Sequence, residues 1–579
     1  MKSIIKLQEL NYQYPSSEEK NLSNINVEVE EGKFVVVMGP TGAGKTTLSL
    51  CCNGLIPQLF EGKVSGSVQM AGMDVSKYRV QTLSKHVGLV LQDPETQIFG
   101  MTVEEDTAFG PRNFMIEREE ILTRVKDALK RVRLSGYEKR NTTELSGGEK
   151  QRLAIAGTLA MTPEILILDE PTSELDPIGR QEIYATLDDL RREKNLTIMV
   201  IEHSSEEIIE KADQVVVLNH GEKVWEGTAR ELFSDIDLLN KYGIKPLASG
   251  VIGWALYKNG YISKEEIPLN VEEAKCILKR LLEGRTIKQL PEKPEKRKET
   301  EAPVVLSVNN LVHKYSNNKK ALNGVNLDIR QGEFVALIGQ NGAGKTTLAK
   351  HFNGLLLPTD GYVMVNGMNT QTMGIDKLSR FIGYVFQNPD HQIFSTTVEK
   401  ELEYGMKNIG IPENEIKERI EKVLNFTGLL KHRDTHPFSL GKGERQLVAV
   451  ASILAIEPRI LVVDEPTTGL DWIGINNMMT LIDTLHKNGT TIIMVTHDMD
   501  IVAKNAHRVI VMKDGEICLD GPTEEVLSSF EVLREAYIAP PQVIQISKIL
   551  QEMGLSRAVV DEEELTAVVL GSLEGYKCS

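Results

Sequence analysis

Cysteine is scarce in this sequence, and so are the features that would anchor a chain in a membrane. The 579 residues include five cysteines, Cys51, Cys52, Cys276, Cys518 and Cys578, none in a C-x-x-C pair or with a histidine at metal-ligand spacing. A sparse, odd set indicates a reducing compartment and excludes a disulfide framework. No apolar run approaches the ~20 residues of a membrane-spanning helix, and the first residues lack a signal-peptide pattern. We therefore expect a chain that does not cross a membrane by itself.

Basic charge is also in deficit. The chain has 66 Lys and Arg against 82 Asp and Glu, a net charge of −16. Binding to nucleic-acid backbones depends on clustered basic side chains, so no nucleic-acid partner is expected, although a local basic patch is compatible with this balance. The length predicts several domains, and 41% hydrophobic and 26% charged residues are ordinary for a globular protein.

A glycine-rich loop follows an apolar run and precedes a helical pattern at residues 39–47, and again at residues 339–347. Both match G-x-x-x-x-G-K-[ST], the phosphate-binding loop, whose backbone N–H groups and helix N-terminus attract an anion. We expect Lys45 and Lys345 to reach the β- and γ-phosphates, and Thr46 and Thr346 to hold Mg²⁺. The expected nucleotide-binding residues of these loops are Gly39, Pro40, Thr41, Gly42, Ala43, Gly44, Lys45, Thr46, Thr47, Gly339, Gln340, Asn341, Gly342, Ala343, Gly344, Lys345, Thr346 and Thr347.

The loop is one part of a larger internal repeat. Lys45 recurs as Lys345, Asp169 as Asp464 and His203 as His497. A repeat of roughly 300 residues is too long for a solenoid and predicts two fused copies of one domain. Apolar runs alternate with helical segments in each copy, which indicates an α/β fold with a parallel sheet covered by helices.

An acidic pair ends a buried strand pattern in each copy. Asp169 and Asp464 are expected to hold Mg²⁺, directly or through water. The next residues, Glu170 and Glu465, are then placed to polarise an attacking water. The alternative is that the pair caps the segment that follows. With a phosphate-binding loop on the same sheet, hydrolysis of a nucleotide is the stronger interpretation.

Two further pairs complete the expected site. His203 and His497 end strands of the same sheet, and the matched placement favours a contact with the γ-phosphate over a structural role. Gln92 and Gln387, each at the end of another strand, are expected to contact Mg²⁺ or the attacking water.

Tyr14 and Tyr315 precede the loops and are expected to stack on the adenine, with core packing as the alternative.

In this order, the motifs resemble those of the ATP-binding cassette ATPases, and the match covers nearly all of both halves. The resemblance includes residues 145–149 (LSGGE), residues 440–444 (LGKGE) and the Asp-containing loops at residues 173–176 and 468–471. It implies two cassettes, each with a mainly parallel core sheet, an antiparallel β subdomain, a helical subdomain and a short C-terminal extension. It also implies an intramolecular cassette dimer that sandwiches two ATPs with Mg²⁺, each phosphate loop facing the other cassette's signature, here Ser146, Gly147, Gly148, Gly441 and Gly443.

The second signature departs from the family pattern. Gly441 replaces Ser, and Lys442 replaces the first Gly. The resemblance implies that the site of Lys345 receives the intact signature and that of Lys45 the altered one. Lys442 either adds positive charge near a phosphate or obstructs the close approach that Gly permits. We expect the site of Lys345 to do most of the hydrolysis.

A narrower resemblance lies in residues 92–99 (QDPETQIF) and 387–394 (QNPDHQIF), each followed by Thr-Val-Glu. These segments are similar to those of the energy-coupling factor ATPases, which drive vitamin and transition-metal importers. The resemblance implies integral membrane partners, a transmembrane coupling protein and a substrate-binding protein, and a peripheral location on the cytoplasmic face of the cell membrane. It makes Ile98, Phe99, Ile393 and Phe394 candidates for the groove that receives the partner's helices, with core packing as the alternative.

The predicted domains are a first cassette at 1–228, a first extension at 229–285, a solvated linker at 286–303, a second cassette at 304–523 and a second extension at 524–579. Two other functions remain open: a soluble twin-cassette ATPase that acts on ribosomes or nucleic acid, and the ATPase of a conventional solute importer.

Overall fold

The computed structural model describes residues 3–15, 17–173, 175, 177–194, 196–203, 206–291, 302–315 and 320–574. The chain forms two compact units. Unit 1 comprises residues 1–250, 264–270 and 471–473, and unit 2 comprises residues 251–263, 271–470 and 474–579. No described helix is both long and apolar enough to span a bilayer.

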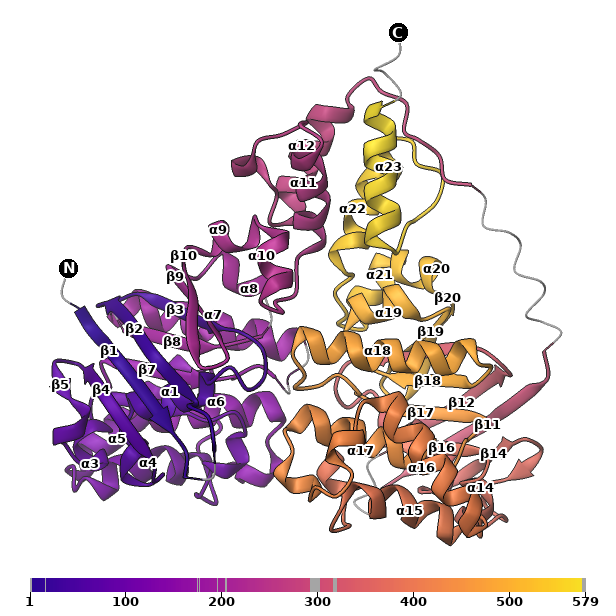
Figure 1. The fold of residues 1–579 in the computed structure, drawn as a ribbon, viewed down its shortest axis with the longest axis horizontal. Coiled ribbons are helices and arrows are strands. Elements are labelled where there is room, and N and C mark those ends of the chain that lie inside the picture. The colour runs from indigo at the N-terminus through magenta and orange to yellow at the C-terminus, as the bar shows by residue number, and fades with distance from the viewer. Residues whose placement is uncertain are drawn as a thin grey trace. The chain divides into compact units, whose positions relative to one another are not determined.

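Unit 1 is built on two sheets. Strands of the antiparallel sheet, drawn in indigo in Figure 1, are in spatial order β2 (Leu22–Glu30), β1 (Ser3–Gln13), β4 (Lys63–Met70) and β5 (Met73–Asp74). The core sheet has the order β10 (Glu222–Gly227), β9 (Gln214–Asn219), β3 (Phe34–Met38), β8 (Thr197–Ile201), β7 (Ile165–Asp169) and β6 (Val87–Val90). All neighbouring strands within this sheet are parallel, except that β9 and β10 are antiparallel to each other. Because β3, β7 and β8 are buried along their whole length, their sequences are continuous apolar runs.

The core of unit 1 joins the two sheets through the helix that follows β3. Leu7 and Val27 of the antiparallel sheet belong to the same buried cluster as Val35 of β3 and Leu48 of α1 (Lys45–Cys52). Cys51 and Cys52 on α1 are buried as well, and burial raises the pKa of Cys52 to about 12. The phosphate-binding loop is therefore held between a buried strand and a buried helix.

The helical part of unit 1 contacts β6, the edge strand of the core sheet. It contains α4 (Val103–Asn113), α5 (Arg118–Arg131) and α6 (Gly147–Leu159), which contact one another. The helix α7 (Pro177–Lys194) leads from β7 to β8, and the segment after β10 forms α9 (Ala229–Phe233), α10 (Ile236–Lys241) and the beginning of α11 (Ala248–Lys258).

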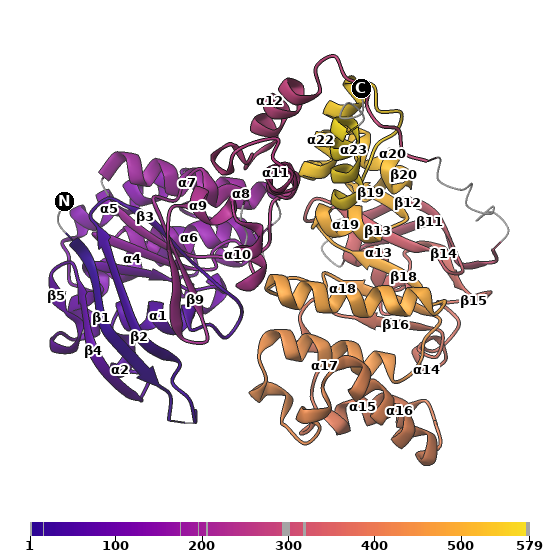
Figure 2. The same ribbon diagram turned by 45° about the horizontal axis from the view of Figure 1, so that its top comes forward.

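Unit 2 repeats this plan. Its antiparallel sheet has the order β12 (Lys320–Arg330), β11 (Val304–Lys314), β14 (Asp360–Val365) and β15 (Met368–Asn369). Its core sheet has the order β16 (Ile382–Val385), β17 (Ile460–Asp464), β18 (Thr491–Val495), β13 (Phe334–Gly339), β19 (Arg508–Lys513) and β20 (Glu516–Pro522). The helix after β13 is α13 (Lys345–Phe352), and a helical group is formed by α15 (Val398–Asn408), α16 (Glu413–Thr427) and α17 (Lys442–Leu454), seen together in Figure 2.

The sequence-based prediction of the fold is thus confirmed: each half has a mainly parallel core sheet, an antiparallel sheet and helices, and further helices follow the last core strand. The loop residues Glu174 and Asp176 and the cysteine Cys578 lie outside the described residues.

The C-terminal helices of unit 2 include part of the segment that follows the first cassette. The helix α12 (Val271–Leu282) contacts α22 (Gln542–Glu552) and α23 (Glu562–Glu574). Beyond α12, the amide of Lys288 donates to Ser572 at 2.8 Å, and Gln289 bonds to both Gly554 and Ser556. Residues 287–289, which belong to the predicted solvated linker, are therefore packed on the second extension.

Candidate functional site

Each phosphate-binding loop begins at a position that only glycine fits. Gly39 has φ +138°, and a Cβ there would lie 2.0 Å from the carbonyl oxygen of Leu218. Gly339 repeats this at φ +151°, with the carbonyl oxygen of Met512 at 2.3 Å. A side chain at either position would clash with the backbone of the neighbouring strand, so the loop keeps its tight curve only with glycine.

The two lysines point back into their loops. Lys45 donates from Nζ to the carbonyls of Gly39 and Pro40 at 2.9 and 3.0 Å. Lys345 donates to those of Gly339 and Gln340 at 2.7 and 3.1 Å. Burial lowers the pKa of Lys45. A buried ammonium that spans the loop in this way is placed to transfer its hydrogen bonds to phosphate oxygens.

The aspartates that end β7 and β17 lie beside the threonines that follow the lysines. Asp464 Oδ1 accepts from Thr346 Oγ1 at 3.3 Å. Asp169 is buried, and its Oδ1 has no hydrogen-bond partner among the described residues. Burial raises the pKa of Asp169 to about 6. Hydroxyl and carboxylate oxygens suit Mg²⁺, and an unpartnered buried carboxylate oxygen fits such an ion, so the residues present are compatible with the metal.

The adjacent glutamates have a strained backbone. Glu170 and Glu465 have φ of +45° and +49°, a left-handed conformation that is rare outside glycine. Their amides donate to Ile201 and Val495 at 3.0 and 2.8 Å, which ties each strained residue to the next strand. The strain therefore fixes the direction in which the carboxylate leaves the strand end.

In unit 1 the expected partners of the glutamate come together. Gln92 Nε2 donates to Glu170 Oε2 at 2.8 Å, and His203 Nε2 lies 2.7 Å from Glu170 Oε1. Both oxygens of the carboxylate thus have partners from other strand ends. A carboxylate held between an amide and an imidazole is positioned to orient a water molecule.

In unit 2 the set is less complete. His497 Nδ1 lies 2.8 Å from Glu465 Oε2. Gln387, by contrast, is exposed and makes no hydrogen bond to Glu465 in the part of the chain that the structure describes. The structure thus brings together all four expected strand-end residues of unit 1 and leaves Gln387 apart in unit 2.

The two tyrosines lie against their phosphate-loop helices. Tyr315 Oη is 2.9 Å from Thr347 Oγ1, and Tyr14 Oη is 3.4 Å from Thr47 Oγ1. Tyr14 meets the edge of another ring, Tyr12, at 4.7 Å between centroids. These contacts hold each ring beside the helix that follows its phosphate-binding loop.

The signature segments begin helices in both units. In unit 1, Ser146 caps α6 by accepting from the amide of Glu149 at 3.3 Å, and Gly147 and Gly148 form the first turn. In unit 2, Gly441 has no side chain to cap α17.

The side chain of Lys442 runs over Gly469. A Cβ at Gly469 would lie 2.8 Å from the ammonium of Lys442, and Gly443 follows Lys442 in the first turn of α17. Lys442, the lysine of the altered signature, therefore lies along a loop of its own cassette.

Several residues near these sites escaped sequence analysis. Tyr384 donates to Asp464 Oδ2 at 2.7 Å. His351 is buried and bonds to Thr347 and His313 at 2.7 and 3.2 Å. The sequence could have pointed to Tyr384 and His351 only through a comparison of the two copies, because the first copy has Leu89 and Cys51 at the matching positions.

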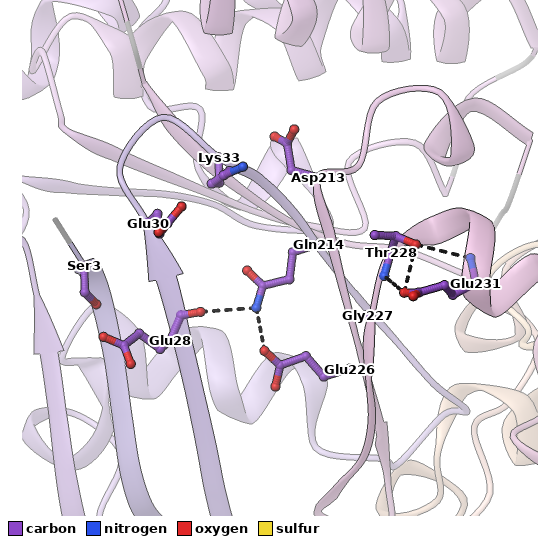
Figure 3. Close-up of a pocket in the computed structure, with 10 residues that line it drawn as sticks. All are labelled: Ser3, Glu28, Glu30, Lys33, Asp213, Gln214, Glu226, Gly227, Thr228 and Glu231. Atoms are coloured by element: carbon purple, nitrogen blue, oxygen red, sulfur yellow. Dashed lines mark hydrogen bonds between the residues drawn. The ribbon is translucent and has the colours of Figure 1, made fainter. Parts of the chain in front are cut away.

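A separate pocket of about 720 Å³ lies on unit 1 (Figure 3). Its charged side chains are Glu28, Glu30, Asp213, Glu226 and Glu231 with a single lysine, Lys33, and Gln214 bridges the carbonyl of Glu28 and the carboxylate of Glu226. None of its residues belongs to the phosphate-binding loop. An acidic lining repels phosphate groups, so this pocket is not the nucleotide site.

Comparison with known proteins gives consistent results across the chain. The family profile described as ABC transporter matches residues 22–173 and 322–468. A protein of Caldanaerobacter subterraneus subsp. tengcongensis, provisionally named an ABC transporter ATP-binding protein, is 42% identical over 96% of this chain and 97% of its own length. A Methanosarcina mazei protein with the same provisional name is 42% identical over 95% of this chain and 94% of its own length. A solved structure, cbiO1 from Clostridium perfringens, described as part of the ABC transporter complex cbiONQ, is 40% identical over 40% of this chain and 94% of its own, with a TM-score of 0.37.

Proposed function

Since this chain belongs to the ABC transporter family as an ATP-binding, ATP-hydrolysing protein of a transporter, we propose that it energises a membrane importer of the energy-coupling factor type. Such an importer takes up vitamins or transition-metal ions. In this proposal two ATPs with Mg²⁺ lie between the cassettes, and the chain sits on the cytoplasmic face of the cell membrane, bound to a transmembrane coupling protein and a substrate-binding membrane protein.

The observation that carries the proposal is an exposed aromatic pair at matching positions of both cassettes. Phe99 is 70% exposed and stacks on Phe109, which is 48% exposed, with centroids 5.5 Å apart. Phe394 is 60% exposed and meets Tyr404, which is 50% exposed, at 4.5 Å. Single exposed apolar residues need no explanation, but a paired exposed cluster that recurs in both halves does.

The backbone that carries each phenylalanine is held by a side-chain carboxylate. Asp106 Oδ1 on α4 accepts from the amides of Phe99 and Gly100 at 2.8 and 2.9 Å. Glu401 Oε2 on α15 accepts from those of Phe394 and Ser395 at 3.1 and 2.8 Å. Both acids are buried. A buried carboxylate that fixes the backbone presents the aromatic side chain outward with little loss of conformational entropy on binding.

For the neighbouring isoleucines, the sequence left two roles open: lining a partner-binding groove or packing in the core. Ile393 is buried and packs in the core, and Ile98 is half-buried. Of the four candidate groove residues, only Phe99 and Phe394 are exposed. Rigid exposed aromatics of this kind are typical anchors for an apolar helix of a partner protein, which favours a membrane subunit with short cytoplasmic helices.

The strand-end residues have roles in this proposal. Asp169 and Asp464, with Thr46 and Thr346, hold Mg²⁺, which neutralises charge on the phosphates. Glu170 and Glu465 polarise the attacking water, while His203 and His497 bind the γ-phosphate. Gln92 contacts the water or metal, and Gln387 does so after moving inward. Tyr14 and Tyr315 stack on adenine, and Ser146, Gly147, Gly148, Gly441 and Gly443 contact the ATP of the opposite cassette.

The experiment is removal of the aromatic anchors. The tagged chain with Phe99→Ala and Phe394→Ala is purified from gently solubilised membranes and compared with wild type. The matched control replaces Phe60 and Phe426, which are 45% and 42% exposed and lie outside the two pairs, by alanine. We expect the anchor variant to lose its membrane partners and keep basal ATP hydrolysis, and the control to retain both. Equal recovery of membrane partners by the anchor variant would contradict the proposal.

Two other functions remain as outcomes of the same experiment. Ribosomal proteins or nucleic acid recovered with wild type, and no membrane protein, would favour a soluble twin-cassette ATPase. A single pair of large membrane subunits with a soluble binding protein would favour a conventional solute importer.

A further inference from the structure

The two candidate sites differ in one residue of the strand next to the aspartate that is proposed to hold the metal. In β6 the residue paired with Ile167, two before Asp169, is Leu89. In β16 the residue paired with Val462, two before Asp464, is Tyr384. The identical register shows that Leu89 and Tyr384 occupy the same place in the two sheets.

From this position Tyr384 contacts Asp464. Tyr384 Oη donates to Asp464 Oδ2 at 2.7 Å, while Thr346 Oγ1 donates to Oδ1 at 3.3 Å. Tyr384 is 5% exposed and Asp464 is 2% exposed, so water does not compete for this hydrogen bond. Both oxygens of Asp464 are thus directed by a hydroxyl donor.

The geometry of the sheet explains why tyrosine reaches and leucine does not. A strand rises about 3.3 Å per residue, so two residues span about 6.6 Å, close to the length of a tyrosine side chain. Leucine is much shorter and has no donor. In the first cassette Asp169 Oδ1 is left without a hydrogen-bond partner among the described residues.

We propose that Tyr384 is a positioning residue that holds the Asp464 carboxylate in the orientation in which it receives Mg²⁺, and that the two cassettes therefore bind the metal–nucleotide complex unequally. The inference rests on the proposed role of Asp464 as a metal-holding residue. Hydrogen bonds to a metal-holding carboxylate orient it and tune its affinity for the ion. The second cassette has this tyrosine donor, and the first has Leu89, which has no donor, at the matching position.

The alternative role for Tyr384 is purely structural. Its ring packs against Phe386 with centroids 5.0 Å apart and belongs to the buried cluster under the sheet. Phenylalanine keeps this packing and removes only the hydroxyl. A structural role predicts that Tyr384→Phe changes stability and leaves metal affinity as it was.

The test measures metal binding at the second site without turnover. The full chain carries Lys45→Ala, which weakens nucleotide binding at the first site, and is saturated with a non-hydrolysable ATP analogue. Mn²⁺ is titrated in, and the free ion is followed by electron paramagnetic resonance. Tyr384→Phe is compared with the Lys45→Ala parent, and Tyr384→Leu, which installs the residue of the first cassette, is the second variant if the first fails to fold.

We expect Tyr384→Phe and Tyr384→Leu to raise the Kd for Mn²⁺ about tenfold, the lower end of the effect of losing an outer hydrogen bond. Affinity for the analogue in EDTA should stay unchanged. Asp464→Asn separates the two possible failures. If Asp464→Asn keeps Mn²⁺ affinity, the proposed role of Asp464 is wrong. If Asp464→Asn loses Mn²⁺ while both Tyr384 variants bind it as the parent does, the inference about Tyr384 is overturned.

Discussion

Arg445 donates from Nε to Asp390 Oδ1 at 2.7 Å and thereby joins the helix that carries the signature sequence to the segment that carries Phe394. Lys150 and Glu95 form the same link at the matching positions of the first cassette. Each proposed docking segment is therefore tied by one ion pair to the helix that begins at the signature. A shift of the signature helix on nucleotide binding would be passed directly to the docking segment.

The ion pair of the second cassette provides a test with a conservative control. Asp390→Ala removes the link, and we expect ATP hydrolysis in the solubilised membrane complex to fall several-fold. Because the pair is partly exposed, the cost in stability should stay at about 0.2–1 kcal/mol. Asp390→Glu with Arg445→Lys recreates the pair of the first cassette and should retain hydrolysis. Equal rates in all three proteins would show that the link transmits nothing.

Hydrolysis should be unequal between the two catalytic glutamates. In the proposed arrangement the phosphate loop of Lys345 receives the intact signature of Ser146, so Glu465→Gln should lower the ATPase rate about 100-fold or more, the usual effect of losing a general base. Glu170→Gln should leave clearly more activity, since in the same proposed arrangement its site receives the signature altered at Lys442. Steady-state phosphate release measures both variants. Equal losses would remove the proposed asymmetry and leave the transporter assignment intact.

Acid should destabilise the second cassette through His351. Burial lowers the pKa of His351 to about 4, below its ordinary value of about 6.5. The unfolded chain therefore binds the proton first, and the stability that comes from a neutral His351 is complete above pH 6.5. It is lost as the pH falls from 6.5 toward 4. The full effect is about 3 kcal/mol of the free energy of unfolding.

The matched control for this prediction is His351→Cys, the residue that the first cassette has at Cys51. Hydrogen exchange in α13 and β11 of the full chain at pH 7 and pH 5 measures local stability. We expect faster opening at pH 5 in wild type and a smaller difference in His351→Cys. The same acid response in both proteins would mean that His351 is not the group that titrates.

Sequence alone was sufficient for the features that follow from strict local patterns. The phosphate-loop glycines require one backbone shape, so Gly39 and Gly339 could be recognised without a structure. Continuous apolar runs ending in Asp169 and Asp464 predicted buried parallel strands correctly, because such strands need apolar residues on both faces.

Side-chain relations between distant elements could not be predicted in this way. Whether Gln387 reaches Glu465 depends on a loop conformation, and the hydrogen bond from Tyr384 to Asp464 depends on strand register across a sheet. The packing of residues 287–289 on the second extension was also missed, because the charged stretch after them dominates the local composition. Such relations are set by tertiary contacts, which periodicity does not encode.

The proposed work of this ATPase on a membrane importer is tested most directly by identifying what the wild-type chain binds. The tagged chain is recovered from gently solubilised membranes, and its companions are identified by mass spectrometry. We expect a small pair of multi-span membrane proteins, one of which varies with the transported compound. Recovery of ribosomal proteins without any membrane protein would contradict it.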